Sequence, residues 1–537
     1  MRTAMFVAVG VALLAVASVR GWQVVSGLQW PFDSDHFRNI ANAVTFRDGG
    51  VLSDAHYAGA TAWYSPLTSA LLAIGSIVTF VPIHRLGAQG GVVLNLVTPI
   101  ALTAVTARWF GRRVALGTLV AYLFVIATNS PSWAVASYSP WLFVNVYATG
   151  LFVLALAALP SAVNRGDTKD ALLFGVGGGV VVLAHPAYAI MLTFVAAVLF
   201  LEACWRAGRP ALRRIGRSAG ISLLTAVVVS APFWLPIMIR YQWQVVNPRA
   251  GTYTWPEVES SELWEFVREF VWRWPMLVIA VGVPLWLFGR RRRRRSGPLH
   301  VDGVSVLTTW TAVALVLMFV QVYRDAAVVD VLPLPDSPAH HYLLAFTVAL
   351  CIWFGLGLDA IVRTVLRRHD ARWGAVAVVF AVAVMAAVTV PRWRDRIDLA
   401  GGRAEAQVMS GRLDSFRVVD WIRHHTRPGD RFLNVGPGTW NGVLLPGLAG
   451  RKSVDINIPE YSSPFVSYTE RQDAAGRMVD ALRRCDRARF RRLARPFGRV
   501  RYVISESGPG VVSVCPEIVP IAYRDDAVTI QRISATP

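Results

Sequence analysis

Charged residues are scarce in this chain. Asp, Glu, Lys and Arg make up only 16% of its 537 residues, against about 25% in ordinary soluble proteins. Hydrophobic residues, in contrast, make up 54%. This composition argues against an ordinary soluble protein and favours a membrane protein.

Acidic residues are scarcer than basic ones. The chain has 34 Asp and Glu and 54 Lys and Arg, which gives a net charge of +20. The basic excess could indicate a nucleic-acid partner, but the arginines lie in packets beside apolar blocks, near residues 108–113, 206–217, 290–295 and 363–368. No basic face lies on a module with a known docking motif. The pattern is typical of the cytoplasmic links of membrane proteins, so we expect a lipid bilayer and no nucleic acid as partner.

Cysteine is also rare, with four residues, and no CxxC pair or His/Cys spacing indicates a zinc site. The chain has no Walker phosphate-binding loop, and its tail has no nucleophile elbow. Familiar zinc and nucleotide-binding motifs are therefore absent.

What the chain does have is a series of apolar blocks along residues 1–391, many of them close to the ~20 residues that cross hydrocarbon as a helix. They begin near Thr3, Ala62, Gly91, Val114, Trp141, Ala171, Ala187, Ala219, Trp274, Val304, His341 and Trp373. Residues 392–537 contain no such block. We predict a polytopic α-helical membrane module, residues 1–391, and a soluble α/β domain, residues 392–537.

The arginine packets also predict the topology. With the packets in the cytoplasm, the N-terminus is cytoplasmic and the C-terminal domain is extracytoplasmic. The first apolar run is expected to be retained, because residues 17–20 form a poor signal-peptide cleavage site. Opposite termini require an odd number of crossings, yet twelve blocks are apparent. We therefore predict 11 or 13 spans, with residues 65–82 re-entrant or one span missed.

Within the tail, helices are predicted over residues 416–424 and 473–494, and strands over 431–435, 443–445, 500–505, 511–514 and 527–532. Cys485 and Cys515 both lie in this tail, in an oxidising compartment, which predicts a disulfide between them. Cys204 and Cys351 lie in apolar segments, where a thiol packs as a small hydrophobe.

The first outer loop contains Asp33-Ser34-Asp35, followed by His36 and Arg38. Two carboxylates one residue apart repel each other unless a cation or a proton-transfer role holds them together. They suit a general base or a pair of ligands for a divalent cation such as Mg²⁺, Mn²⁺ or Ca²⁺. The alternative is structural, with Ser34 or Asp35 capping a helix over residues 34–44.

Two further outer segments carry polar side chains. Arg324, His340 and His341 belong to a link that enters a span, and such residues bind an anionic headgroup through charge-assisted hydrogen bonds. The alternative for this link is a solvated loop with helix-capping residues. His185 lies before a proline between two apolar halves. It could contact a substrate phosphate or hydroxyl, or simply belong to a proline hairpin.

The chain resembles the GT-C superfamily of membrane glycosyltransferases, which includes actinobacterial mannosyl- and arabinofuranosyltransferases. The resemblance rests on short motifs: Asp33-Ser34-Asp35, Trp63-Tyr64-Ser65-Pro66-Leu67, Ala107-Arg108-Trp109-Phe110-Gly111-Arg112-Arg113, Leu183-Ala184-His185-Pro186, Val418-Val419-Asp420-Trp421-Ile422 and Ala522-Tyr523-Arg524-Asp525-Asp526-Ala527-Val528.

This resemblance implies transfer of a sugar from a polyprenyl-phosphate donor to an extracytoplasmic acceptor, a glycan, glycolipid or protein. Asp33 would take the proton of the acceptor hydroxyl, with inversion at the anomeric carbon. Arg324, His340 and His341 would stabilise the leaving phosphate. Asp35 would bind a divalent cation or orient the acceptor.

The main alternative is a transporter or a lipid or glycan flippase without transferase activity. Such a protein places ionisable residues within broken helices near the bilayer midplane. Here the spans are nearly free of acids, and the charges gather at their ends.

Overall fold

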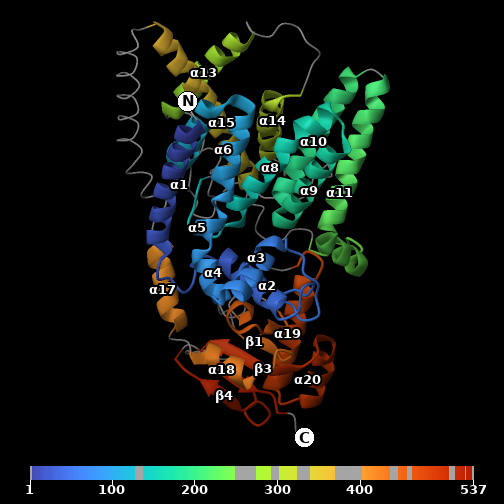
Figure 1. Ribbon diagram of the computed structural model, residues 1–537. Helices are drawn as coiled ribbons and strands as arrows, with labels where there is room; N and C mark the ends of the chain where they lie inside the picture. Colours follow the sequence, from blue (N-terminus) through green and yellow to red (C-terminus); the bar gives the residue numbers. More distant parts are fainter. Residues whose placement is uncertain are drawn as a thin grey trace. The chain divides into compact units, whose positions relative to one another are not determined.

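The computed structural model describes residues 3–126, 137–207, 209–247, 274–291, 301–322, 339–368, 402–414, 417–435, 445–455, 463–506, 514–526 and 528–534. The chain divides into two compact units (Figure 1). The first comprises Met1–Ser26, Gln89–Ala231 and Trp255–Arg403, and the second comprises Gly27–Ala88, Pro232–Thr254 and Ala404–Pro537. A boundary at residue 391 stays a prediction, and the observed units instead place the first loop with the tail.

Every regular element described in the first unit is a helix. Its elements are α1 (Thr3–Val25), α5 (Gly91–Leu94), α6 (Val97–Phe110), α7 (Arg112–Val120), the π-helical η1 (Ala121–Val125), α8 (Val144–Asn164), α9 (Thr168–Ala184), α10 (Pro186–Arg206), α13 (Trp274–Arg291), α14 (Gly303–Val322) and α15 (Ala339–Arg368). The long helix α11 (Arg209–Tyr241) begins in this unit, and Pro232 and Pro236 interrupt its hydrogen bonding near its end.

Among the described residues, seven helices are long and apolar enough to cross a membrane, and a bent pair of helices raises this number to eight. The seven are Thr3–Val25, Gly91–Phe110, Val144–Asn164, Pro186–Arg206, Ala211–Tyr241, Gly303–Gln321 and Ala339–Val365. The block near Trp274 forms a shorter apolar helix, Pro275–Phe288, and the block near Trp373 lies outside the described residues. The polytopic fold is confirmed, and the total of 11 or 13 spans stays a prediction.

Small residues allow α13 and α15 to pack closely. A Cβ added at Gly282 would lie 2.4 Å from both the Cα and the carbonyl oxygen of Gly357, too close for any side chain. Apolar side chains gain little from leaving lipid, so membrane helices associate by such close backbone contact. The two glycines therefore determine how α15 is held.

The second unit combines the first loop with the tail. The loop contributes α2 (Ser34–Arg47), α3 (Leu67–Thr79) and α4 (Ile83–Gln89), and α3 and α4 meet at a bend of 114°. Such a bend belongs to a broken span or a re-entrant loop, and the second of these is what the sequence suggests for residues 65–82.

The tail is a small α/β domain, as predicted. Its helical elements are α17 (Gly402–Asp414), α18 (Arg417–His425), η4 (Leu445–Ala449), α19 (Tyr468–Arg483), α20 (Arg487–Ala494) and η6 (Arg495–Phe497). Its strands are β1 (Arg431–Val435), β2 (Lys452–Ser453), β3 (Val500–Glu506), β4 (Ile521–Arg524) and β5 (Val528–Arg532). They form one sheet in the order β2-β1-β3-β5-β4, in which β2, β1 and β3 are parallel to one another and the β3–β5 and β5–β4 pairs are antiparallel.

Three predicted strands are confirmed, namely those that became β1, β3 and β5. Of the other two, residues 443–444 and 511–513 lie outside the described residues, and Leu445 begins a π-helical turn rather than ending a strand. The single helix predicted over residues 473–494 is wrong, because the chain breaks at Cys485, whose φ of 57° lies in the left-handed region.

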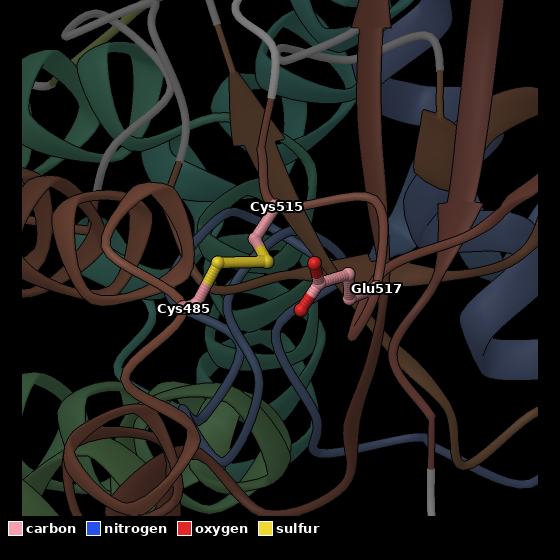
Figure 2. A group of neighbouring side chains, drawn as sticks. All are labelled: Cys485, Cys515 and Glu517. Atoms are coloured by element: carbon pink, nitrogen blue, oxygen red, sulfur yellow. A yellow bond between two sulfur atoms is a disulfide. The ribbon is translucent and has the colours of Figure 1, made fainter.

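The predicted disulfide between Cys485 and Cys515 lies at this break. Cys485 is bonded to Cys515, with their Cα atoms 5.4 Å apart, and Glu517 lies beside the pair (Figure 2). The bridge ties the α19–α20 turn to the segment before β4. The free cysteines Cys204 and Cys351 are half-buried and buried, respectively.

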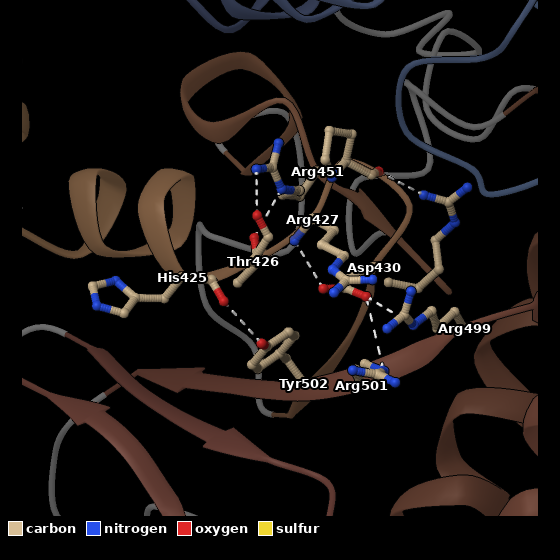
Figure 3. Close-up of polar contacts among 10 residues, drawn as sticks. His425, Thr426, Arg427, Asp430, Arg451, Arg499, Arg501 and Tyr502 are labelled. Carbon is tan, nitrogen blue, oxygen red and sulfur yellow. Dashed lines mark hydrogen bonds and ion pairs between the residues drawn. The ribbon is translucent and has the colours of Figure 1, made fainter. Parts of the chain in front are cut away.

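A buried carboxylate closes the turn between α18 and β1 (Figure 3). Asp430 accepts a hydrogen bond from the backbone nitrogen of Arg427 at 2.9 Å and pairs with Arg499 of the approach to β3 at 3.3 Å. On the other side of the turn, the Arg451 guanidinium donates to the side-chain and backbone oxygens of Thr426, at 2.8 and 3.0 Å. These contacts fix the start of the sheet against α18.

Candidate functional site

Asp33 begins helix α2. Its extended backbone (φ −93°, ψ 143°) is that of an N-cap, and its Oδ1 accepts a hydrogen bond from the Asp35 backbone nitrogen at 2.8 Å. The cap is therefore Asp33, not Ser34 or Asp35, and the helix continues to Arg47. Among the described residues, Asp33 Oδ2 has no hydrogen-bond partner, so capping occupies only one oxygen of the carboxylate.

Asp35 occupies the first turn of α2 and pairs with Arg38 one turn later. The Asp35 carboxylate lies 3.1 Å from Nη2 of Arg38. Arg38 is almost fully buried, and its guanidinium lies 3.8 Å from the centroid of the Tyr64 ring. The Asp35 side chain is 39% exposed, so one face of this ion pair is open to solvent.

The electrostatics of the helix start distinguish Asp33 from an ordinary surface aspartate. Burial, followed by the neighbouring charge of Asp35, raises the pKa of Asp33 to about 6, and Arg38 acts in the opposite direction. A carboxylate with a raised pKa is a stronger base, and at neutral pH it is still mostly ionised.

His36 lies against aromatic rings. Burial lowers the pKa of His36 to about 4, so its imidazole is neutral at physiological pH. The Phe32 ring meets it edge-on at 5.8 Å, and nearby Trp30 stacks on His84 at 4.0 Å between centroids. A neutral, enclosed imidazole positions groups by shape and hydrogen bonding rather than by charge.

The tail holds the first loop through backbone contacts. Tyr57 forms a parallel bridge with Ser453 of β2, where Ser453 N donates to His56 O at 3.1 Å and Ala58 N donates to Ser453 O at 3.4 Å. The Lys452 ammonium also donates to the Asp54 carbonyl oxygen, at 2.5 Å. The loop thus covers the β2 edge of the sheet, which would otherwise expose unpaired backbone groups.

The loop itself is shaped by a buried carboxylate. Asp54 is 3% exposed, and its Oδ1 accepts hydrogen bonds from the backbone nitrogens of His56 and Tyr57, at 2.8 and 2.7 Å. Burial raises the pKa of Asp54, while these donors and the charge of Lys452 lower it. Burial lowers the pKa of His56 to about 3, assisted by the charge of Arg38, so this histidine is neutral too.

A second group of predicted residues lies in the first unit. His185 caps α10, with its Nδ1 accepting from the Ala187 backbone nitrogen at 3.3 Å. Its ring lies 4.4 Å from that of His341, which in turn lies 4.0 Å from His340. His185 and His340 are buried, and Tyr188 meets the His185 ring edge-on at 5.5 Å. The fold thus brings His185 close to His340 and His341, although His340 follows it by 155 positions in the sequence.

The predicted site residues therefore form two groups in different units. Asp33, Asp35, His36 and Arg38 belong to α2 and its cap, whereas the three histidines belong to α10 and α15. Arg324 lies outside the described residues. The sequence prediction missed Tyr64 and His84. Tyr64 lies within the quoted Trp63–Leu67 motif, and that motif was the signal that could have identified it.

Whether the described residues could hold a metal ion depends on which His, Cys, Asp and Glu ligand atoms lie together. In the described part of the chain, the one cluster of three or more His, Cys, Asp or Glu ligand atoms is Cys485, Cys515 and Glu517. Its two sulfurs form the disulfide and are not available as thiolates. Among the residues that the structure describes, no third His, Cys, Asp or Glu ligand atom joins Asp33 and Asp35 in a cluster. They fit only a cation that completes its shell with water or substrate oxygens, as Mg²⁺ commonly does.

Comparison with known proteins yields similarity in structure only. No family model matches the chain, and no curated protein matches it in sequence. The crystal structure of ArnT from Cupriavidus metallidurans bound to undecaprenyl phosphate superposes with a TM-score of 0.55 and 14% identity, covering 98% of both chains. Its apo structure has the same TM-score and identity over 97% of both chains. The apo oligosaccharyltransferase of Archaeoglobus fulgidus gives a TM-score of 0.49 at 13% identity, over 93% of this chain and 69% of that one.

The similarity to ArnT extends from end to end and includes both the helical module and the tail. The chain therefore has the fold of ArnT.

Proposed function

We propose that this protein is a membrane glycosyltransferase, a hexosyl- or pentosyltransferase that moves a sugar from a polyprenyl-phosphate donor to an acceptor of the cell envelope. The observation that carries the proposal is the Asp33 carboxylate. It has a raised pKa and one oxygen engaged in capping, and it begins a helix in a chain with the ArnT fold.

Asp33 is the general base in this proposal. Oδ1 is fixed by the Asp35 backbone nitrogen, which leaves Oδ2 to accept the proton of an acceptor hydroxyl. As the proton moves to Oδ2, the hydroxyl oxygen attacks the anomeric carbon, and the bond to the lipid phosphate breaks. A single displacement of this kind inverts the anomeric carbon. The proton acceptor must stay deprotonated in the resting enzyme, which a pKa of about 6 allows at neutral pH.

The donor phosphate is assigned to the histidine group, His185, His340 and His341, together with Arg324. The support is chemical, because a guanidinium donates charge-assisted hydrogen bonds to phosphate oxygens and an imidazole N–H can donate to them as well. The undecaprenyl phosphate of the ArnT structure provides the analogy for a polyprenyl carrier. An aminoarabinose-, mannosyl- or arabinofuranosyltransferase would use the same arrangement, with the sugar selected elsewhere.

Asp35 supports the base and would, with Asp33, be the ligand pair for a divalent cation. When bound, such a cation would supply positive charge beside the acceptor hydroxyl and favour its deprotonation. The Asp35 carboxylate already pairs with the Arg38 guanidinium at 3.1 Å, so a cation bound there would share this carboxylate with Arg38. Equilibrium binding of Mn²⁺ to the resting protein, and its loss in an Asp35→Asn variant, tests this assignment without an activity assay.

Asn substitution separates capping from catalysis. Asp33→Asn keeps a good N-cap, since Asn and Asp cap about equally well, but its amide cannot accept a proton in the reaction. We expect transfer from a radiolabelled polyprenyl-phosphate sugar to fall by about 10²- to 10⁴-fold with α2 intact. Asp167→Asn, an exposed cap of α9, is the matched control and should transfer normally. Undiminished transfer by Asp33→Asn would remove Asp33 as the base.

In the proposed membrane topology, the N-terminus is cytoplasmic and the C-terminal domain is extracytoplasmic. A C-terminal fusion to alkaline phosphatase should be active, and the same fusion at Arg165, in the α8–α9 link, should be inactive. The opposite pattern would place the tail in the cytoplasm.

Transport is less well supported. Within the seven described spans only Glu202 and Asp359 are acidic, and each pairs with an arginine four residues later, at 2.6 and 2.7 Å. A chain of exchangeable intramembrane carboxylates, which ion-coupled transport requires, is not found in these spans.

A further inference from the structure

A groove of 430 Å³ lies between α19 and α20 in the tail, away from the residues assigned above. One part of its lining is apolar and includes Phe497, Leu493 and Pro496. The other part is polar and includes Glu470 and three arginines, Arg471, Arg477 and Arg492. The groove therefore combines an apolar face with positive charge.

The surrounding segment is unusually basic. Residues 468–501 contain eleven arginines against four carboxylates, although the tail carries no membrane-spanning block whose orientation such charges would set. Arg477 and Arg492 are exposed and form no ion pair or hydrogen bond with the described residues. Their charge is thus available to a ligand.

Arg471 lines the groove and is held in place by several contacts. Its guanidinium lies 5.0 Å from the centroid of Phe497 and equally 5.0 Å from that of Tyr57. Two of its nitrogens donate to the carbonyl oxygens of Val454 and Ala58, both at 3.2 Å. A guanidinium has five N–H donors, so the side chain is held rigidly and still has donors to offer.

We propose that this groove binds an anionic glycan, one whose sugars carry carboxylate or phosphate groups, as a subsite for the acceptor. Guanidinium groups bind carboxylate and phosphate in a bidentate manner, and Arg477 and Arg492 supply two of them. The C–H face of a sugar ring is apolar and packs on Phe497, while its hydroxyls can donate to Glu470. The volume is sufficient for one or two sugar rings.

Arg471 gives the subsite a connection to the first loop. It binds the Ala58 carbonyl directly, and the 54–58 turn belongs to the same loop as Asp33. A glycan held in the groove therefore contacts a residue that also fixes that loop. The role as an acceptor subsite rests on the proposed glycosyltransferase function, whereas glycan binding by the groove does not.

The test uses the purified full-length protein and two probes of equal length, a glucuronic-acid trisaccharide and a neutral glucose trisaccharide. We expect the acidic probe to bind and the neutral one to bind at least about tenfold more weakly, because it lacks charge-assisted hydrogen bonds. The double variant Arg477→Gln/Arg492→Gln should bind the acidic probe about tenfold more weakly than the native protein. Inorganic phosphate should compete with the acidic probe.

The matched control removes the same charge elsewhere on these helices. Arg484 and Arg489 are exposed and do not line the groove, so Arg484→Gln/Arg489→Gln should bind the acidic probe within about twofold of the native protein. Equal losses in both double variants would show a diffuse charge effect and overturn the groove as a site. Equal binding of the neutral and acidic probes would overturn the anionic ligand.

Two further measurements separate glycan binding by the groove from membrane binding and from the catalytic role of Asp33. If the groove variant loses binding to vesicles of anionic phospholipid but keeps the trisaccharide, the groove is a membrane contact and the proposal fails. Asp33→Asn should bind the acidic probe normally. If Asp33→Asn still transfers sugar while the groove variant loses probe binding, the catalytic assignment fails and the glycan site stands.

Discussion

The guanidinium of Arg38 lies over the Tyr64 ring, 3.8 Å from its centroid, and its Nη2 lies 3.1 Å from Oδ1 of Asp35. The aromatic ring and burial fix the position of a charge that would otherwise be mobile in water. Arg38 therefore lowers the pKa of Asp33 by a constant amount, while Asp35 raises it.

The pKa of Asp33 predicts how transfer depends on pH. A base must be deprotonated to act, and with a pKa of about 6 it becomes protonated at higher pH than an ordinary aspartate. The rate of transfer should therefore fall as the pH is lowered through about 6, by about tenfold per unit at lower pH. A steady-state profile of kcat/KM between pH 4.5 and 8 measures this limb. A flat profile down to pH 4.5 would contradict it.

Substitutions of the two neighbouring charges should move that limb in opposite directions. Arg38→Gln removes a charge that lowers the Asp33 pKa, so the midpoint of the limb should rise. Asp35→Asn removes a charge that raises the Asp33 pKa, so the midpoint should fall. The pH–rate profile of each variant gives the midpoint independently of its absolute rate. Shifts of the same sign in both variants would exclude Asp33 as the titrating group.

Arg38→Lys distinguishes the charge from the planar stacking. Lysine keeps the positive charge but has no planar guanidinium to place over the Tyr64 ring. The limb should shift less than in Arg38→Gln, while the maximal rate still falls because Asp35 is held less firmly. Identical profiles for the native and lysine proteins would leave no role for the stacking.

The sequence predicts the helical part of this protein well, because twenty apolar residues in a row have one stable conformation in lipid. The number of membrane spans is harder to predict from the sequence. The 65–82 block contains only α3, and the chain bends by 114° between it and α4, a bend that hydropathy does not report. In the tail, the 473–494 helix was predicted unbroken, since Arg484 to Asp486 are compatible with a helix and only the disulfide reveals the left-handed turn at Cys485.

For the candidate site, the sequence predicted Asp33 and Asp35 from their spacing and their position after the first apolar run. It could not predict which residue caps the helix, because Asp33, Ser34 and Asp35 are all good caps. The sequence could not predict contacts such as that of Lys452 with Asp54, since these residues are 398 positions apart. The groove was not apparent either, because its arginines lie on two helices that the sequence predicted as one.

Loss of the disulfide should loosen the tail. The bridge closes a loop with a sequence separation of 30, for which the chain-entropy model gives a stabilisation of about 3–4 kcal/mol. The double variant Cys485→Ser/Cys515→Ser should show faster amide hydrogen exchange in α19 and α20. Reductant should produce the same change in the native protein and none in the variant. Unchanged exchange in both would show that the bridge contributes little.

Removal of the Asp54 carboxylate should release the 54–58 turn. Asp54→Ala leaves the buried amides of His56 and Tyr57 without acceptors, at a cost of about 1–3 kcal/mol each. Exchange of these two amides and of Ser453, which donates to His56, should accelerate. Asp54→Asn keeps a carbonyl oxygen as acceptor and should be much milder. If the alanine and asparagine variants exchange alike, the two backbone hydrogen bonds are not what holds the turn.

The bridge between Tyr57 and Ser453 imposes an order on biosynthesis. The loop is synthesised early, but the strand that covers it follows 398 residues after Asp54, or about 20–80 s later at ordinary translation rates. During that interval every intervening span must be inserted while the loop has no partner. The nascent chain therefore assembles this part of the protein late, although the loop is among the first segments to be made.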